Sequence, residues 1–167
     1  MAEPDTRPEG FQRVTAALAE LAHPHRPLWL DVAARTAQEA ADALGVTLGQ
    51  IAKSVVFRRK EDDSAVLVIT SGDRRVDEAK LKPHIGALGR ADADFVKART
   101  GFSIGGVSPA GFAPADGAAP PRLFIDRDLF RFDIIWAAAG HPNGVFKLTP
   151  AELEKLTGAP VIDVVQT

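Results

Sequence analysis

Ser54-Val55-Val56-Phe57-Arg58 is a run rich in β-branched residues, and a second such run, Ala65-Val66-Leu67-Val68-Ile69-Thr70, follows it closely. The charged segment Lys60-Glu61-Asp62-Asp63 separates the two runs. Two β-branched runs joined by a short polar segment predict a β-hairpin. This hairpin is the clearest structural feature of the sequence, and the other elements are predicted outward from it.

Further strands and helices are predicted on both sides of the hairpin. Short apolar runs predict strands over residues 28–32, 123–125, 133–138, 145–148 and 161–165. Helical spacing and capping signals predict helices over residues 9–22, 36–45, 76–84, 92–99 and 149–158. Thr36 with Glu39, and Thr149 with Glu152, have the spacing of a capping box, in which each side chain binds the other residue's backbone N–H.

The order of these elements predicts the fold class. Strands outnumber helices and alternate irregularly with them, so a doubly wound parallel sheet is not expected. The stretch from Ala113 to Pro121 is rich in Ala, Pro and Gly and predicts a surface loop rather than a domain boundary. We therefore expect a single α+β domain over residues 1–167, with residues 1–8 as a flexible N-terminus.

The composition of the 167 residues excludes several classes of protein. Hydrophobic residues make up 46% and charged residues 25%, which is ordinary globular usage and excludes long disorder. No apolar run is long enough to cross a bilayer, so no membrane partner is expected. The absence of cysteine excludes disulfides, thiolate metal sites and cysteine nucleophiles, and a cytoplasmic location is the expectation.

The charge pattern leaves room for a few phosphate contacts only. The net charge is −2, which excludes a protein that binds nucleic acid through a global basic field. Residues 53–82 carry eight Lys and Arg against six Asp and Glu, so the centre of the chain is mildly basic. That excess fits either a site for a few phosphates or an ordinary solvated surface.

Motifs for metal, cofactor or triad chemistry are not found. The four histidines lack the spacing of a metal site, so neither a metal nor a cofactor is expected. His141 lies in the turn Ala139–Gly144, where it is either a polar turn residue or a ligand-facing group. Ser103 and Ser108 flank a glycine pair but lack the His and Asp order of a serine triad.

The segment Thr100–Pro109 and Lys53 are the stronger candidates. The pair Gly105-Gly106 either presents backbone N–H groups to a developing oxyanion or forms a tight turn. Lys53 begins an apolar strand, where it is either an exposed strand end or an inward cation that needs an anionic partner such as a phosphate.

These motifs together resemble the YbaK family of aminoacyl-tRNA editing domains, which is related to the editing insertion of bacterial prolyl-tRNA synthetases. The resemblance rests on three segments in order: Ile51–Phe57, Thr100–Pro109, and the turn Ala138–Gly144 with Leu148–Leu153 after it. It implies a curved, mostly antiparallel sheet flanked by helices. It also implies hydrolysis of the ester between a wrong amino acid and the 3′ end of a tRNA, with mischarged tRNA and prolyl-tRNA synthetase as partners.

The resemblance assigns roles to particular residues. Lys53 matches the lysine that holds the terminal adenosine or its phosphate, and Gly105 and Gly106 match a glycine pair that faces the aminoacyl carbonyl. Gly140 and His141 match the opposite wall, and Ser103 and Ser108 are counted with them as substrate-binding residues. The family uses a bound water and substrate hydroxyls, so no protein nucleophile is expected.

Departures from the family pattern narrow the substrate. Some relatives carry a tyrosine in the first strand, where this chain offers only Trp29 and Asp31. Gly49 stands where the branch specific for alanyl-tRNA has asparagine, which argues against alanine. The sequence thus predicts a freestanding deacylase for another small noncognate amino acid, on proline tRNA. The alternatives are a non-catalytic member that binds tRNA or protein and a small-molecule esterase.

Overall fold

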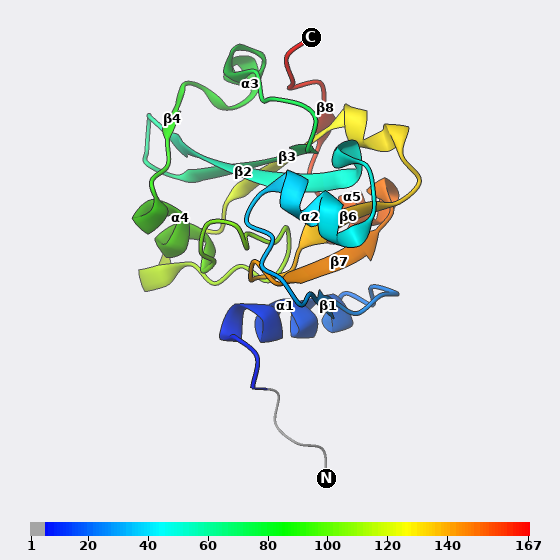
Figure 1. The fold of residues 1–167 in the computed structure, drawn as a ribbon. Helices are drawn as coiled ribbons and strands as arrows, with labels where there is room; N and C mark the ends of the chain where they lie inside the picture. Colours follow the sequence, from blue (N-terminus) through cyan, green and yellow to red (C-terminus); the bar gives the residue numbers. More distant parts are fainter. Residues whose placement is uncertain (1–5) are drawn as a thin grey trace.

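The predicted hairpin is present, and it is longer than the two apolar runs suggest. In the computed structural model, which describes residues 6–167, strand β2 (Ile51–Arg59) pairs antiparallel with β3 (Ala65–Ser71) (Figure 1). The register places Lys53 opposite Thr70. Residues 1–5 of the expected flexible N-terminus lie outside the described part of the chain.

The hairpin is the centre of an open mixed sheet. Residues 6–167 form eight strands in the order β1-β7-β6-β2-β3-β5-β8, and β4 pairs with β2 off this path. The remaining strands are β1 (Leu28–Trp29), β4 (Leu88–Arg90), β5 (Arg122–Asp126), β6 (Ile135–Ala138), β7 (Gly144–Leu148) and β8 (Val161–Ile162). The strands predicted over residues 28–32 and 161–165 are therefore shorter than expected. The three-residue strand β4 was not predicted from the sequence.

The sheet contains more parallel strand pairings than the expected mostly antiparallel sheet. Among the described strands, four pairings are antiparallel and three are parallel, namely β2 with β6, β3 with β5, and β5 with β8. A parallel pair needs a long crossover connection, and helices lie in the connections that lead to β5 and β8. The α+β class is thus confirmed with a sheet more evenly mixed than the resemblance implied.

The described chain forms five α-helices close to the predicted ranges. They are α1 (Glu9–Glu20), α2 (Ala37–Leu44), α3 (Glu78–Ile85), α4 (Ala93–Thr100) and α5 (Pro150–Thr157). The capping box of α5 is complete, with the Thr149 hydroxyl accepting from the Glu152 N–H and the Glu152 carboxylate accepting from the Thr149 N–H. The capping box of α2 is only half formed. The Thr36 hydroxyl accepts from the Glu39 N–H, but the Glu39 carboxylate accepts from the Thr36 hydroxyl, 3.2 Å away, and not from the Thr36 N–H.

Apolar clusters pack on both faces of the sheet. One face packs against α1 through Phe11, Val14 and Leu18, and the opposite face packs against α3 through Leu81 and Ile85. Figure 1 shows α1 and α3 on opposite sides of the β2–β3 hairpin. A third cluster places α2 against the start of β2. The β2–β3 hairpin is therefore packed on both of its faces by apolar side chains.

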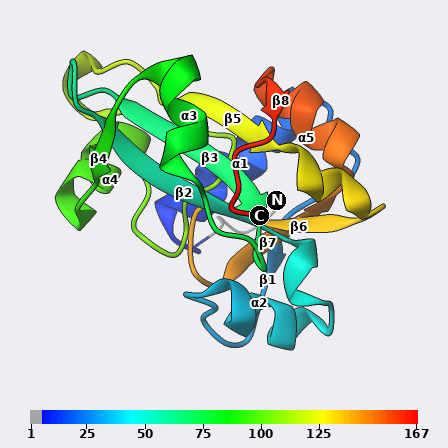
Figure 2. The ribbon, with the colours of Figure 1, turned by 90° about the horizontal axis from the view of Figure 1, so that it is seen from above.

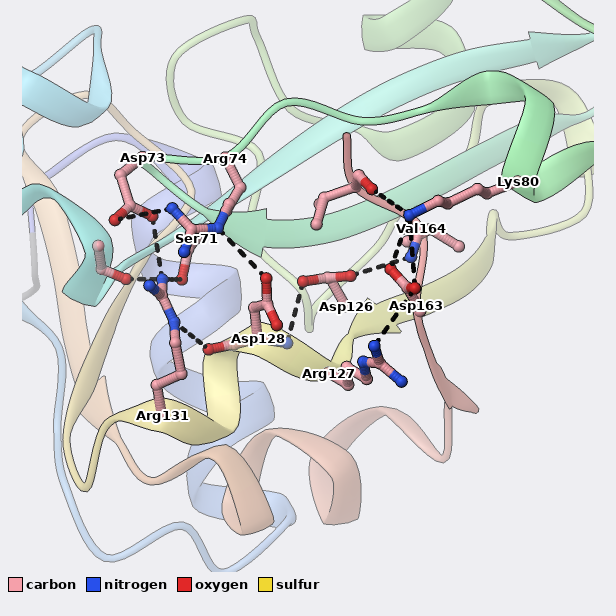
Figure 3. Close-up of polar contacts among 12 residues, drawn as sticks. Ser71, Asp73, Arg74, Lys80, Asp126, Arg127, Asp128, Arg131, Asp163 and Val164 are labelled. Atoms are coloured by element: carbon pink, nitrogen blue, oxygen red, sulfur yellow. Dashed lines mark hydrogen bonds and ion pairs between the residues drawn. The ribbon is translucent and has the colours of Figure 1, made fainter. Parts of the chain in front are cut away.

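A buried carboxylate fastens the C-terminal segment to this base. Asp126 is fully buried, and its two carboxylate oxygens accept hydrogen bonds from the backbone N–H groups of Val164 and Asp128, each at 3.0 Å (Figure 3). Lys80 lies beside this contact, where its ammonium is 3.2 Å from Asp163 and donates to the Val165 carbonyl. Burial raises the pKa of the Asp126 carboxyl, although the two hydrogen bonds oppose that shift.

We expect Asp126→Asn to change how the free energy of unfolding depends on pH. A carboxyl whose pKa is raised on folding stabilises the protein fully at pH values below its unfolded pKa, and this contribution is lost as pH rises through the folded pKa. The asparagine side chain cannot titrate, and its amide oxygen can accept only one of the two N–H groups without opposing its own NH₂. The variant is expected to be about 1–3 kcal/mol less stable than wild type at pH 4, with a smaller deficit at pH 7.

Urea unfolding of both proteins between pH 4 and pH 7 measures this difference. A deficit that is constant or grows with pH would show that burial does not control the Asp126 titration.

Candidate active site

One edge of β2 is left open between two neighbouring strands. β6 pairs only with Ile51 and Ala52, and β4 pairs only with residues 57–59, so the described strands leave residues 53–56 without a partner on that edge. In Figure 2, β4 and α4 lie at one end of the hairpin, and β6, β7 and α2 lie at the other. The sheet therefore has a gap at its centre.

Backbone polar groups of β2 point into this gap. The Ile51 carbonyl accepts from Gly72 and the Arg59 N–H donates to Ser64, so the odd-numbered residues of β2 direct their backbone groups toward β3. Hydrogen-bonding direction alternates along an antiparallel pair, so Ser54 and Val56 direct their N–H and C=O groups toward the gap. Backbone donors and acceptors are thus available to a ligand there.

A pocket of about 400 Å³ occupies the gap and reaches both faces of β2. This volume lies within the range of small-molecule sites. On one face the lining is apolar and comes from the large core cluster, with Ala52, Val56, Ala91, Val96, Val107 and Ala137. On the other face the lining includes Lys53, Arg35 and Thr36 beside the α2 cluster. The pocket therefore has an apolar end and a cationic end.

Lys53 lies in the cationic end without an anionic partner. Lys53 is half-buried, and its ammonium makes no ion pair with any residue in 6–167. Burial lowers the pKa of the Lys53 ammonium, the positive charge of Arg75 lowers it further, and Asp73 opposes both. Arg35 lines the same end and likewise has no ion pair in the described chain. An anion bound here would relieve the repulsion between Lys53 and Arg75.

The loop that carries Arg75 and Asp73 is held by a polar network. Arg131 contacts both Ser71 and Asp73, at 3.1 and 3.0 Å, and the Ser71 hydroxyl donates to the Gly49 carbonyl (Figure 3). The Gln166 N–H donates to the Arg75 carbonyl from the C-terminal segment. These contacts hold the backbone of the loop and the Asp73 carboxylate, whose charge acts on Lys53.

The two glycines of the predicted pair have different environments. Gly105 lines the pocket with φ at +91°, a conformation that side-chain-bearing residues rarely adopt, and its N–H has no backbone partner among the described residues. The Gly106 N–H donates to the Ser103 carbonyl at 3.0 Å, so it is already engaged. The free donor of the pair is therefore the Gly105 N–H.

Gly106 has a packing role. A Cβ atom at this position would lie 2.8 Å from both the Cα and the N atom of His141. We expect Gly106→Ala to lower the free energy of unfolding by about 1–3 kcal/mol, because backbone atoms cannot move away as a flexible side chain can. Gly89→Ala is the matched control, since its Cβ would meet only the ends of the Arg58 and Lys60 side chains. Equal stabilities of the two variants in urea unfolding would contradict this packing role.

The other predicted site residues lie outside the pocket lining. Ser103 is exposed, and Ser108 is fully buried with its hydroxyl accepting from the Ala110 N–H at 3.2 Å. Gly140 has φ at +84° and packs closely against the backbone of Gly10 in α1. The structure thus brings Lys53 and Gly105 together in the pocket lining and leaves Ser103, Ser108 and Gly140 outside it.

His141 stacks on Trp29 beside the pocket. The two rings are 4.9 Å apart with an interplanar angle of 29°, and the His141 Nδ1 accepts from the Asn143 N–H at 3.0 Å. Burial lowers the pKa of His141, and the nearby charge of Arg35 lowers it further. An Nδ1 that accepts from an N–H carries no proton, so in this geometry the ring is neutral with its proton on Nε2.

Among the pocket residues that sequence reasoning did not single out are Arg35 and Ser54, which both carry polar groups. Arg35 directly precedes the capping residue of α2, and Ser54 looks like any polar position in a strand. Among the described residues the lining contains no carboxylate, imidazole or thiol. The hydrogen-bond donors that the lining residues carry are the Gly105 N–H, the Lys53 ammonium, the Ser54 hydroxyl and the guanidinium of the exposed Arg35.

Residues 6–167 contain no group of three or more His, Cys, Asp or Glu side chains placed to hold a metal ion. No helix in that range combines the length and the apolar character that a bilayer crossing requires.

Comparisons with known proteins identify the family of this chain. Residues 31–156 match the model of the aminoacyl-tRNA editing domain. The chain is 35% identical over 136 residues to YwhH of Bacillus subtilis (strain 168), described as uncharacterized, and the match covers 80% of this chain and 83% of that protein. It is 30% identical over 139 residues to the proline--tRNA ligase of Desulfotalea psychrophila, of which it covers 22%, against 83% of its own length.

A solved structure shares the fold throughout. It is the crystal structure of "a putative trans-editing enzyme for prolyl tRNA synthetase", with a TM-score of 0.85 and 36% identity over 97% of this chain and all of the other. The chain is thus homologous to the editing insertion of proline--tRNA ligases. It belongs to the aminoacyl-tRNA editing domain family, of the YbaK type.

Proposed function

We propose that the protein is a trans-acting deacylase that hydrolyses the ester between a small noncognate amino acid and the 3′ end of proline tRNA. The family and the similarity to proline--tRNA ligases support the choice of reaction and of tRNA. YwhH and the solved trans-editing neighbour, which match this chain over most of their own length, support action in trans. Prolyl-tRNA synthetase is the proposed partner, and the cytoplasm, where aminoacyl-tRNA is used, the proposed location.

The observation that carries this proposal is the unpaired Lys53 beside the free Gly105 N–H in one pocket. Two cations, Lys53 and Arg35, suit the terminal phosphate and ribose of an RNA end. The Gly105 N–H suits the oxygen of the ester carbonyl, which becomes negative when water adds to it. The apolar end suits the acyl side chain.

The proposed reaction needs only water as a second reactant. Water adds to the ester carbonyl carbon, and the C–O bond to the ribose breaks. The proton lost by the water passes to the departing ribose oxygen through the neighbouring ribose hydroxyl. The products are the free amino acid and a tRNA with an intact 3′ end, while Gly105 and Lys53 hold the reacting groups in place.

The pocket acts as a size filter in the proposed reaction. A rigid pocket rejects a group that is too large more readily than one that is smaller, so we expect groups from alanine to threonine in size to be cleared. Proline is no larger than threonine, so we expect prolyl-tRNA to survive because its closed ring does not fit the shape that an open side chain fills.

A panel of mischarged proline tRNAs tests the proposal. Loss of radiolabelled amino acid is followed for several small noncognate residues and for proline, with small alkyl esters of the same amino acids as the esterase arm. Selective loss of a small residue from tRNA supports the proposal. Rapid hydrolysis of prolyl-tRNA, cleavage of the alkyl esters alone, or no cleavage at all would contradict it.

A further inference from the structure

Ser54 has a hydroxyl that the described chain leaves unsatisfied. Its Oγ atom is shielded from solvent and has no hydrogen-bond partner, a condition shared among the described side chains only with Thr70. A buried polar atom without a partner is unfavourable, and native proteins contain few of them. Ser54 lines the pocket, whereas Thr70 does not. Rotation about χ1 of Ser54 that turns this hydroxyl toward the pocket would let a ligand supply the missing partner.

The position of Ser54 places this hydroxyl at the apolar end. Side chains alternate between the faces of a strand, so Ser54 shares its face with Ala52 and Val56, and Lys53 lies on the other. Ala52 and Val56 belong to the large core cluster that also supplies Val96 and Val107 to the lining. Ser54 is therefore a polar group in apolar surroundings, where a hydrogen bond to a ligand has little competition from water.

The orientation of the substrate follows from the two ends of the pocket. This step rests on the proposed function, in which the RNA end lies against Lys53 and Arg35. The acyl side chain then extends toward Val96 and Val107 and passes Ser54.

We propose that Ser54 is a specificity-determining residue, which selects acyl groups whose side chain carries a hydroxyl, as in serine and threonine. The Ser54 hydroxyl is already removed from water in the free protein, so its own desolvation adds nothing to the cost of binding. A purely apolar side chain of equal size leaves this hydroxyl without a partner. We expect a preference of about three- to tenfold for the hydroxyl-bearing group, since one neutral hydrogen bond has about that effect.

Two isosteric substrates test the proposal. Seryl and 2-aminobutyryl groups differ by the replacement of OH with CH₃, and both are loaded onto the same proline tRNA with an aminoacylating ribozyme. The measured quantity is the ratio of the two kcat/KM values, seryl over 2-aminobutyryl, for wild type, Ser54→Ala and Ser54→Thr. Ser54→Ala should fold normally, because it removes an unpaired hydroxyl.

The expected ratio is about three to ten for wild type, about one or less for Ser54→Ala, and restored in favour of serine for Ser54→Thr, which keeps the hydroxyl. A loss of general integrity would lower both rates and leave their ratio unchanged. A wild-type ratio near one, or a ratio that Ser54→Ala leaves intact, overturns the role of Ser54 while the deacylase function stands. If neither ester is cleaved above the uncatalysed rate, nor any other ester of the mischarged panel, the proposed function itself fails and the role of Ser54 fails with it.

Discussion

Lys53→Met is expected to lower kcat/KM for deacylation by about 100-fold or more, and at the same time to leave the fold at least as stable as in wild type. The loss follows from the proposed contact between the Lys53 ammonium and the RNA end, since a charge-assisted hydrogen bond is among the stronger polar contacts. The gain in stability follows from the half-buried, unpaired charge that methionine removes. A lysine whose pKa is lowered on folding stabilises the protein fully only above its unfolded pKa, and this contribution is lost as pH falls through the folded pKa.

Deacylation rates and urea unfolding at neutral pH measure the two effects together. Lys60→Met is the matched control, because Lys60 is an exposed lysine that follows the same strand outside the pocket. The salt dependence of tRNA binding should also become shallower, by about one in the slope of log K against log salt, if one phosphate contact is lost. Retained activity in a folded Lys53→Met protein would remove Lys53 from the site.

Gly105→Ala is expected to lower the deacylation rate by about 100- to 1,000-fold, which is the usual cost of one lost oxyanion donor. Alanine disfavours the φ of +91° found here, so the backbone must turn and carry the N–H away from the carbonyl position. The space around a Cβ atom is adequate, because its nearest neighbour would be the Arg35 Cα at 3.5 Å. The effect should therefore fall on the rate more than on stability.

Gly117→Ala separates the two contributions. Gly117 also has a positive φ, +71°, and nothing lies within 4 Å of a Cβ atom placed there. It is outside the pocket, so this variant should lose a similar amount of stability and keep full activity. A Gly105→Ala enzyme as active as Gly117→Ala would show that the Gly105 N–H does not bind the reacting carbonyl.

Much of the fold is encoded in local patterns of the sequence. The β-branched runs around Lys60–Asp63 predicted the β2–β3 hairpin, and the capping residues Thr36 and Thr149 predicted the starts of α2 and α5. Such signals act within one or two turns of the chain, so the sequence alone suffices to reveal them. Strand β4 was not predicted, because its three residues include a glycine and adopt the strand conformation through pairing with β2.

The pocket could be predicted only in part. Lys53 and Gly105 belong to segments that resemble the family, but the gap exists because β6 and β4 pair with opposite ends of β2, and local sequence does not specify such distant pairings. The same limit applies to Gly106, whose N–H is taken by the Ser103 carbonyl, and to Ser54, whose lack of a partner depends on every surrounding element.

A crystal structure with a non-hydrolysable substrate analogue tests the central claim most directly. The amide formed between serine and 3′-amino-3′-deoxyadenosine keeps the aminoacyl carbonyl and the terminal ribose, and replaces the ester oxygen with nitrogen. We expect this amide to bind in the gap of β2, with its carbonyl oxygen accepting from the Gly105 N–H, its ribose beside Lys53 and Arg35, and its hydroxyl at Ser54. An analogue bound elsewhere on the protein, or bound in the gap with the adenosine against Val96 and Val107, would contradict the proposed site.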